Sequence, residues 1–387
     1  APFEIIDGDR GTNYPKQDEF NQNGYCLFLN AKNVTTDGFA FNECYFISQE
    51  KDKILRKGKL QRNDIILTTR GTVGNIGFFN ERIPYDNIRI NSGMVIIRSD
   101  PKGILPEYTH QLFKYLKGDF DVFATGSAQP QLPIRDLKEI SFSLPPLPEQ
   151  RAIAGVLSSL DDKIDLLHRQ NKTLEGMAEA LWRKMFVEEA KAEWPMKEIG
   201  EIADKIQYGL TQSATTETIG PKFLRITDIQ GGIVNWENVP YCYTTEQEFL
   251  KYKLNTGDIV VARTGASTGE NLFIINPPSA VFASYLIRIQ FDNIALSRYV
   301  SIHMRSSEYF NYIDGILSGS AQPNANAKQL TSFKIQLPSF EILDKFYLLV
   351  ESLDEKYHLN NNQINQLSRL RDTLLPKLIS GEVKARQ

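Results

Sequence analysis

The residues that could do chemistry in this sequence are few and lie far apart. "GASTGEN" (Gly265–Asn271) has the glycines of a phosphate-binding loop but lacks the lysine that such a loop uses to hold a nucleotide. No HExxH motif and no paired cysteines and histidines provide the spacing of a metal site. A turn accounts for the two carboxylates of "DGDRG" (Asp7–Gly11). The four histidines are expected on helix surfaces rather than as catalytic bases: His110, His168, His303 and His358.

"NPPS" (Asn276–Ser279) is the one motif with a link to methyl transfer. It is similar to the [DN]PP[FY] element of amino-methyltransferases, but a serine stands where an aromatic ring would stack on an extruded base. No glycine-rich loop follows a first strand to hold the methyl donor. The sequence therefore predicts a protein without catalytic activity and without a metal or cofactor of its own.

Composition is ordinary for a globular protein. The 387 residues include 44 basic and 47 acidic side chains, with a net charge of −3. The three cysteines form no CxxC pair, which favours the reducing cytoplasm over a disulfide framework or a zinc site. No apolar run reaches the roughly eighteen residues of a membrane span, so no membrane association is expected.

The chain repeats itself at half its length. "GSAQP" begins at Gly126 and again at Gly319, which lies 193 positions later. "SSLDDKI" (Ser158–Ile164) is similar to "ESLDEKY" (Glu351–Tyr357), and "NDIILTTRGTVG" is similar to "GDIVVARTGASTG" with a one-residue shift. A repeat this long indicates duplication of a whole unit and pseudo-two-fold symmetry, not a solenoid.

Each half is expected to be a mixed α/β globule followed by a long helix. Strands are predicted for "DIILTTR", "GMVIIRS", "DIVVAR" and "YLIRIQF", and helices for "PEYTHQLFKYLKGDF" and "SRYVSIHMRSSEYFNYI". "PPLPEQ" (Pro145–Gln150) ends the strand-like pattern of the first half. The predicted segments are globular residues 1–147, a helix over 148–190, globular residues 191–338 and a helix over 339–387.

Apolar residues in both helices recur at alternating steps of four and three, as in the seam of a coiled coil. The predicted seam consists of Ile153, Leu157, Leu160, Ile164, Leu167, Asn171, Leu174, Phe346, Val350, Leu353, Tyr357, Ile364, Leu367 and Leu374. Pro376 is expected to end or kink the second helix early. Either two amphipathic helices each bury their stripe in a globular core, or they pair as antiparallel rods. The duplication favours the pair, because equivalent helices have equivalent stripes to bury.

The repeated phrases resemble one family. "LPPLPEQRAIAGVLSSLDDKIDLLHRQNKTLEGMAEALWRKMF" (Leu144–Phe186) resembles the central conserved region of the specificity subunits of type I restriction–modification enzymes, and "LSRLRDTLLPKLISGEV" (Leu367–Val383) resembles their distal conserved region. "GDIVVARTG" and "GSAQP" are similar to phrases in the target-recognition domains of these subunits. The resemblance covers nearly the whole chain. It departs at "LPSFEIL" (Leu337–Leu343), where the family reads closer to "LPPLPEQ".

The resemblance implies a DNA-reading adaptor. Two target-recognition domains, joined by two long antiparallel coiled-coil helices with pseudo-two-fold symmetry, would each read one half of a bipartite site in double-stranded DNA. Two modification subunits would dock on this chain and carry S-adenosylmethionine, and restriction subunits would carry ATP and Mg²⁺. The alternatives are a coiled-coil scaffold that binds no specific DNA sequence, and a self-sufficient DNA methyltransferase or nuclease.

Base readers are expected among side chains with forked donors or amides, because arginine pairs with guanine and asparagine or glutamine with adenine. Candidates in the first half are Arg10, Asn13, Lys32, Asn33, Arg70 and Arg89. Candidates in the second half are Gln207, Tyr208, Gln212, Arg225, Asp228, Arg263 and Thr264. Gln129 and Gln322 stand at the same place in both copies. We expect them to be structural, since readers of different bases should differ.

A basic strip in "KDKILRKGKLQR" is the candidate for phosphate contacts, against the alternative of an ordinary solvated face. It consists of Lys51, Lys53, Arg56, Lys57, Lys59 and Arg62. Because the chain as a whole is slightly acidic, DNA binding by the isolated chain is expected to be weak.

Overall fold

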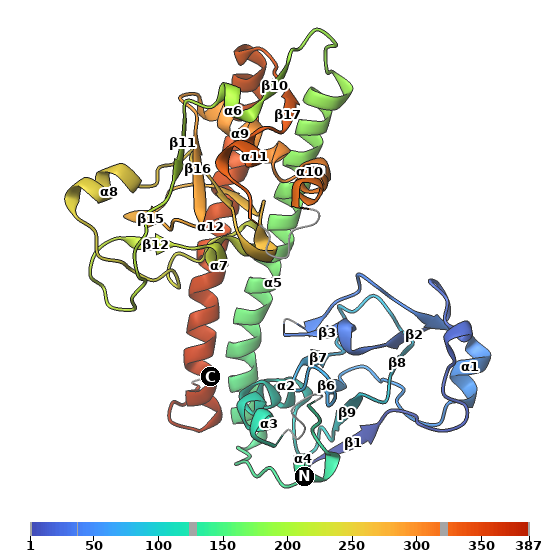
Figure 1. The fold of residues 1–387 in the computed structure, drawn as a ribbon. Helices are drawn as coiled ribbons and strands as arrows, with labels where there is room; N and C mark the ends of the chain where they lie inside the picture. Colours follow the sequence, from blue (N-terminus) through green and yellow to red (C-terminus); the bar gives the residue numbers. More distant parts are fainter. Residues whose placement is uncertain (1, 37, 124–129, 318–323, 386–387) are drawn as a thin grey trace. The chain divides into compact units, whose positions relative to one another are not determined.

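The computed structural model describes residues 2–36, 38–123, 130–317 and 324–385 (Figure 1). Gln129 and Gln322 lie outside the described residues. The chain forms two compact units. Unit 1 consists of Ala1–Asp165 and Leu367–Gln387, and unit 2 of Leu166–Gln366. Each unit therefore holds one end of each long helix.

Unit 1 contains short strands and helices before its share of the long helices. Its strands are β1 (Phe3–Asp7), β2 (Cys26–Leu29), β3 (Val34–Thr35), β4 (Gly38–Phe39), β5 (Phe46–Ile47), β6 (Ile65–Thr68), β7 (Ile76–Phe78), β8 (Ile88–Ile90) and β9 (Met94–Ser99). Its helices are η1 (Gln17–Glu19), η2 (Ala31–Asn33), α1 (Gln49–Ile54), α2 (Pro106–Tyr115), α3 (Lys117–Phe123) and α4 (Ile134–Leu137).

Unit 2 repeats much of this order. Its strands are β10 (Met196–Glu198), β11 (Lys205–Tyr208), β12 (Lys222–Leu224), β13 (Ile259–Ala262), β14 (Asn271–Phe273), β15 (Ala280–Phe282), β16 (Leu286–Gln290) and β17 (Lys334–Gln336). Its helices are α6 (Ile199–Ile202), α7 (Ile226–Ile229), η4 (Gln230–Gly232), α8 (Glu246–Tyr252), η5 (Gly265–Ser267), α9 (Ile294–His303), α10 (Ser307–Leu317) and α11 (Ala327–Thr331).

The main sheets of the two units have the same strand order. The order is β1-β9-β6-β7 in unit 1 and β11-β16-β13-β14 in unit 2, and all neighbours are antiparallel. The central pair aligns Ile65 with Ile97 in unit 1 and Ile259 with Ile289 in unit 2. The repeat in the sequence is therefore the repeat of one mixed α/β unit.

The central strands are buried on both faces, which explains their unbroken apolar sequences. In unit 1, Ile65 and Leu67 pack with α2 and the long helices, whereas Ile66 packs against the smaller sheet β5-β2-β8. In unit 2, Ile259 faces the helical side and Val260 faces the pair β12-β15. Successive side chains of a strand point to opposite faces, so one strand serves two cores.

The predicted strands are confirmed, but the predicted shorter helices are each broken once. "DIILTTR" contains β6 and "DIVVAR" contains β13. In unit 1, α2 ends at Tyr115 and α3 begins at Lys117. In unit 2, α9 ends at His303 and α10 begins at Ser307, because a turn intervenes in which the Ser306 amide bonds the His303 carbonyl at 3.1 Å.

The two long helices are α5 (Leu147–Arg183) and α12 (Phe340–Ile379). A π-helical turn, η3 (Lys184–Glu188), follows α5 and places Phe186 in the core of unit 2. The predicted early end of α12 at Pro376 is wrong. The helix continues to Ile379, and the Ser380 amide closes the last turn on the Pro376 carbonyl at 2.9 Å. A proline so near the end costs one hydrogen bond rather than the helix.

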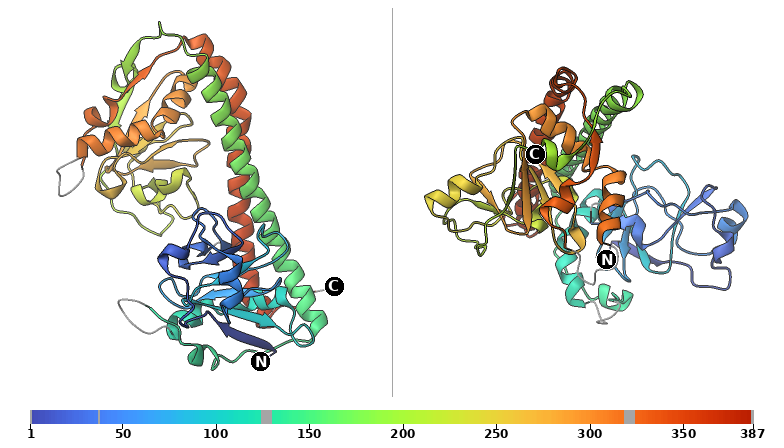
Figure 2. Two further views of the ribbon diagram at one scale, coloured as in Figure 1. Left: turned by 90° about the vertical axis from the view of Figure 1, so that its right-hand side faces the viewer. Right: turned by 45° about the horizontal axis from the view of Figure 1, so that its top comes forward.

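Within each unit the two long helices contact each other, and both views of Figure 2 draw them side by side. In unit 1, Ile153 and Leu157 pack with Leu378, and Asp161 bonds Arg371 at 3.1 Å. In unit 2, the Asn360 amide bonds Asn171 at 2.9 Å. All fourteen seam residues are buried or half-buried. Among the described residues, no helix is long and apolar enough to cross a membrane.

Candidate nucleic-acid interface

Two predicted base readers of unit 1 lie around one turn. Arg10 follows β1, and its guanidinium bonds the Asp7 carboxylate at 3.1 Å and the Ser92 carbonyl at 3.4 Å. Arg70 follows β6, and its amide bonds the Gly93 carbonyl at 3.2 Å. The Arg70 guanidinium has no partner among the described residues. The ends of β1 and β6 thus bring two arginines to the turn that precedes β9.

The same strand ends of unit 2 bring together two further candidates. Tyr208 ends β11 and is 42% exposed. The Arg263 guanidinium lies 5.2 Å from the centre of its ring, a distance suited to a cation–π contact. The buried Nε of Arg263 has no partner in the described part of the chain. Thr264 lies beside it and pairs with Asn324 through an isolated bridge.

Arg89 and Asn33 are corrections to the predicted set, because both are interior. Arg89 is 5% exposed, and its guanidinium bonds the Asp52 carboxylate at 2.6 Å and backbone carbonyls of Asp52, Leu55 and Lys57. Asn33 is 2% exposed and uses its amide on three backbone groups. A buried side chain that is bound inside the fold cannot reach a base edge.

Two candidates of unit 2 are also braced within the fold. Gln207 accepts a bond of 2.7 Å from Arg288 and donates to the Lys251 carbonyl at 3.3 Å. Asp228 binds the Arg225 guanidinium at 2.9 Å and caps the Arg225 amide at 2.8 Å. This pairing raises the pKa of Arg225. These bonds stabilise the loops around Gln207 and Asp228, and their assignment as base readers stays a prediction.

The remaining candidates lie on the surface without forming a cluster. Asn13 and Gln212 are exposed, and Lys32 pairs loosely with Glu43 at 3.4 Å. The sequence did not single out Tyr285, which is 59% exposed and whose carbonyl bonds the Arg263 amide at 3.1 Å. The signal for Tyr285 is its position directly before β16, where the first copy has a glycine.

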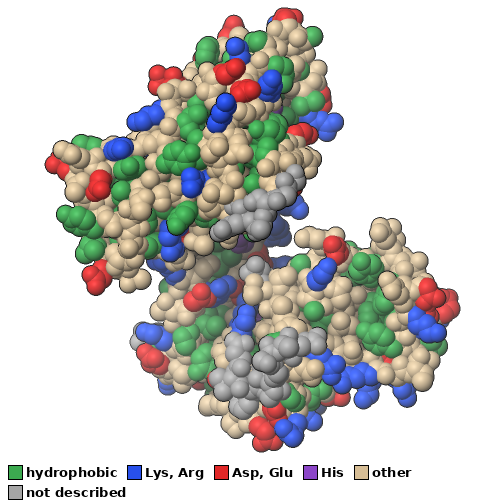
Figure 3. Space-filling view, in the orientation of Figure 1, with side chains coloured by type: hydrophobic (Ala, Val, Ile, Leu, Met, Phe, Trp, Pro, Cys, Tyr) green, Lys and Arg blue, Asp and Glu red, His purple; other side chains and the backbone are tan. Residues whose placement is uncertain are grey.

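The six cations of the basic strip differ in their surroundings, because three form ion pairs and three are exposed. Lys51 pairs with Glu19 at 2.8 Å, Lys59 with Asp52 at 2.5 Å, and Arg62 with Asp86 at 2.7 Å. The other three cations are exposed and form no ion pair with the residues that the structure describes: Lys53, Arg56 and Lys57. Figure 3 shows basic side chains interspersed with acidic ones on the visible face of each unit. A broad positive surface is therefore not evident on that face.

The motifs tested for catalysis serve structural roles. Asp9 accepts bonds from the amides of Gly11 and Arg56, at 2.8 and 2.7 Å. Burial would raise the pKa of Asp9, but these backbone donors lower it overall. Asn276 occupies a left-handed turn with φ of 43°. The bonds of Asp9 and the turn at Asn276 hold loops in place, so neither residue is positioned as a nucleophile or a base.

Two histidines differ from the predicted surface positions. His110 stacks on Phe78 with ring centres 5.1 Å apart, and His303 packs edge-on against Tyr299 at 4.6 Å. Burial lowers the pKa of His110 to about 3 and that of His303 to about 4, so both are neutral packing residues at physiological pH. The described residues contain no group of three or more His, Cys, Asp or Glu side chains arranged to hold a metal ion.

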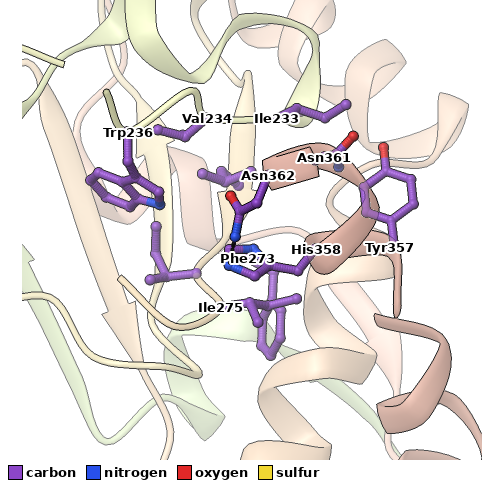
Figure 4. A pocket seen from close by; sticks show the side chains of 12 residues that line it. Ile233, Val234, Trp236, Phe273, Ile275, Tyr357, His358, Asn361 and Asn362 are labelled. Carbon is purple, nitrogen blue, oxygen red and sulfur yellow. Dashed lines mark hydrogen bonds between the residues drawn. The ribbon is translucent and has the colours of Figure 1, made fainter. Parts of the chain in front are cut away.

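An apolar hollow lies in unit 2 between η4, β14 and α12 (Figure 4). Trp236 and Phe273 line it from the globular side. His358 and Asn362, 3.1 Å apart, line it from the helix. None of the predicted base readers lines this hollow, which is a packing gap beside the long helix.

Comparisons with known proteins agree over nearly the whole chain. The family model for the type I restriction modification DNA specificity domain matches residues 3–176 and again 191–369. The specificity subunit of the type I restriction enzyme MjaIX from Methanocaldococcus jannaschii is 27% identical over 389 residues, covering 92% of this chain and 87% of that protein. The EcoKI specificity subunit of Escherichia coli strain K12 is 21% identical, with coverage of 97% and 87%.

A solved structure shares the fold. The S subunit of a type I restriction–modification system from M. genitalium matches with a TM-score of 0.62 at 18% identity, covering 97% of this chain and 93% of that one. These relatives support neither a pure scaffold nor a self-sufficient enzyme. The chain belongs to the type I restriction–modification DNA specificity family, and is a non-catalytic DNA-recognition subunit of such a system.

Proposed function

We propose that each unit contributes one target-recognition domain, and that each domain reads one half of a bipartite site in double-stranded DNA. The observation that carries this proposal is that one chain of the specificity family contains two units with the same order of strands. Two half-sites on a helix need two readers at a defined separation and rotation. The proposed division is domains over 1–147 and 191–338, with spacer helices over 148–190 and 339–387.

In this proposal the helices form an antiparallel coiled coil with pseudo-two-fold symmetry that sets the separation of the half-sites. The contacts of α5 with α12 inside each unit support it: an apolar seam in unit 1 and a pair of asparagines in unit 2. Regular helices of this length rise about 1.5 Å per residue and can act as a ruler.

The outer faces of these helices are the proposed docking surface for two modification subunits. Leu348 and Leu359 lie eleven residues apart on α12 and are 73% and 62% exposed. Eleven residues make about three helical turns, so the two leucines share a face. In this proposal the two leucines would be covered by a modification subunit.

The partners supply the chemistry. Modification subunits would carry S-adenosylmethionine, and restriction subunits would carry ATP and Mg²⁺, since this chain has no motif for these ligands. All three cysteines are free, which supports action in the reducing cytoplasm.

The test is methylation by the chain reconstituted with its modification subunits, read by methylation-sensitive sequencing. We expect methylation within a bipartite sequence with a spacer of constant length, and none by the chain alone. Methyl transfer by the chain alone, or methylation at a single uninterrupted site, would contradict the proposal.

A further inference from the structure

The two units share one backbone frame at the end of the main sheet. Strand register pairs Thr68 with Met94 in unit 1 and Ala262 with Leu286 in unit 2. Counting from these pairs gives equivalent positions at the strand ends, which we call the strand-end rim. They are Asp7 and Tyr208, Thr69 and Arg263, Arg70 and Thr264, Gly93 and Tyr285, and Gln131 and Asn324.

Backbone bonds at the rim support this equivalence. The Thr69 amide bonds the Gly93 carbonyl at 2.8 Å, as the Arg263 amide bonds that of Tyr285 at 3.1 Å. The Thr69 carbonyl accepts from the Leu132 amide, as the Arg263 carbonyl does from Ala325, both at 2.9 Å. Each unit therefore builds its rim from the same turns.

A glycine beside the rim is required by sterics in both units. A side chain on Gly8 would place its first carbon 2.2 Å from the Asn91 carbonyl oxygen. A side chain on Gly209 would meet the Ala283 carbonyl oxygen at the same 2.2 Å. The close crossing of two backbone segments is thus a property of the frame and allows no substitution.

The side chains carried by this frame differ between the units. The arginine stands at the second position after β6 in unit 1 (Arg70) but at the first position after β13 in unit 2 (Arg263). Beside Arg70 stands Gly93, and a carbon added there would lie 3.7 Å from the Arg70 Cβ. Unit 2 has the small Thr264 in place of Arg70 and Tyr285 in place of Gly93. Of these two neighbouring positions, the one with the large side chain is therefore Arg70 in unit 1 and Tyr285 in unit 2.

Structural positions at the opposite end of these two strands, directly before β6 and β13, do not vary in this way. Asp64 and Asp258 are equivalent, and each caps a backbone amide, that of Gln61 at 2.7 Å and that of Asn255 at 3.0 Å. An identical support with exchanged side chains at its edge is expected where the two units must recognise different sequences, because specificity comes from different contacts on the same frame.

The rim side chains are also available for a ligand. Among the residues that the structure describes, the Arg70 guanidinium lacks a partner, and the Arg263 guanidinium lies over the Tyr208 ring without a hydrogen bond or an ion pair. By contrast, Arg89 and Arg298 are bound to carboxylates at 2.6 Å. A free, oriented guanidinium can form the two parallel bonds that guanine O6 and N7 accept.

We propose, on the basis of the proposed function, that the strand-end rim is the base-reading edge of each unit. Arg70 reads a guanine of the half-site bound by unit 1. Arg263, stacked on Tyr208, reads a guanine of the half-site bound by unit 2, and Tyr285 contacts a neighbouring base.

The experiment uses the full chain in complex with its modification subunits. Duplexes with both half-sites randomised and the spacer kept constant are selected by binding. Arg70→Ala should lower the preference at one position of one half-site by roughly five- to a hundred-fold, and Arg263→Ala or Tyr285→Ala should do so only in the other half-site. Arg70→Lys should lower the base preference as much as Arg70→Ala does, because lysine retains the positive charge but lacks the two parallel N–H donors of the guanidinium.

Arg135→Ala is the control, since Arg135 is an exposed arginine of α4 that belongs neither to the rim nor to the long helices, and it should leave the selected sequence unchanged. Thermal unfolding of each variant shows whether it folds. The rim is not the base-reading edge if every rim variant keeps the base preferences of the wild-type chain. The same conclusion follows if the variants weaken binding to both half-sites equally and Arg70→Lys restores that binding. Selection of no sequence by the wild-type complex would instead overturn the proposed function.

Discussion

The asparagine pair between α5 and α12 in unit 2 provides a quantitative test of how the long helices are aligned. Asn360 is 1% exposed and donates to Asn171 Oδ1 at 2.9 Å, while Asn171 donates to Asn361 at 2.8 Å. Asn360 Oδ1 has no partner among the described residues. Replacing Asn171 by leucine removes both bonds and leaves the Asn360 amide with only a 3.5 Å contact to Gln170.

The magnitude follows from this geometry. A buried amide left without its partner costs about 1–3 kcal/mol of stability, whereas replacing both partners by apolar groups is nearly neutral. Asn171→Leu and Asn360→Leu should therefore each destabilise unit 2, and the double variant should be more stable than the sum of the two predicts. We expect a coupling free energy of about 1–3 kcal/mol.

The assay is urea unfolding followed by tryptophan fluorescence. The three tryptophans are Trp182, Trp194 and Trp236, and all lie in unit 2, so the signal reports the unit that contains the pair. Gln363→Leu is the matched control, because Gln363 is exposed on the same helix and its change should stay within about 0.5 kcal/mol.

Additive changes in the free energy of unfolding would contradict this prediction. If the free energies of the single variants add to within about 0.3–0.5 kcal/mol, the two asparagines do not act as a pair. If they do act as a pair, the double variant should also lose selectivity for spacer length, since a buried polar pair specifies the register of a helix pair.

Three further predictions concern the helices and their ends. Inserting four residues in both helices, after Asn171 and after Ile364, adds about 6 Å of helix. In a selection with varied spacers, the preferred DNA spacer should become longer by roughly one or two base pairs. An unchanged preferred spacer at full affinity would show that the helices do not set the spacer length. A fragment of residues 1–190 lacks the segment Leu367–Gln387 that belongs to unit 1, so it should self-associate through its exposed seam, and a monomer in light scattering at tens of micromolar would count against this. Burial would raise the pKa of Asp161, but Lys114, Gln111 and Arg371 lower it overall, so its stabilising effect is complete above the unfolded value of about 3.9 and is lost as pH falls through the folded pKa. Asp161→Asn should reduce stability at pH 7 and weaken the dependence on pH in this acid range by circular dichroism; an unaltered dependence would contradict it.

Much of the fold could be predicted because its signals are local. The apolar runs of β6 and β13 and the four–three spacing of α5 and α12 depend on residues close in sequence, and hydrophobic burial acts on them wherever they lie. The internal sequence repeat predicted that the chain contains two copies of one structural unit. The breaks between α2 and α3 and between α9 and α10 were missed, because continued apolar periodicity conceals a change of direction between two helices.

The candidate site was only partly predictable, because residue type does not say which way a side chain points. Arg70 and Arg89 have the same chemistry, but Arg89 lies within β8 and is bound by Asp52, while Arg70 follows the end of β6 and has no such partner among the described residues. Asn33 has the amide of a base reader but is 2% exposed and uses this amide inside the fold.

By itself, the sequence determined that the chain is a duplication, where its strands and long helices lie, and which family it resembles. These properties follow from the order and spacing of residues along the chain. Tertiary structure alone decided that Arg70 lies beside Gly93 and Gln131, and that Arg263 and Thr264 lie beside Tyr285 and Asn324. The reason is physical: register between strands is set by hydrogen bonds among segments far apart in sequence, and a shift of one residue moves a side chain to a different place on the same frame.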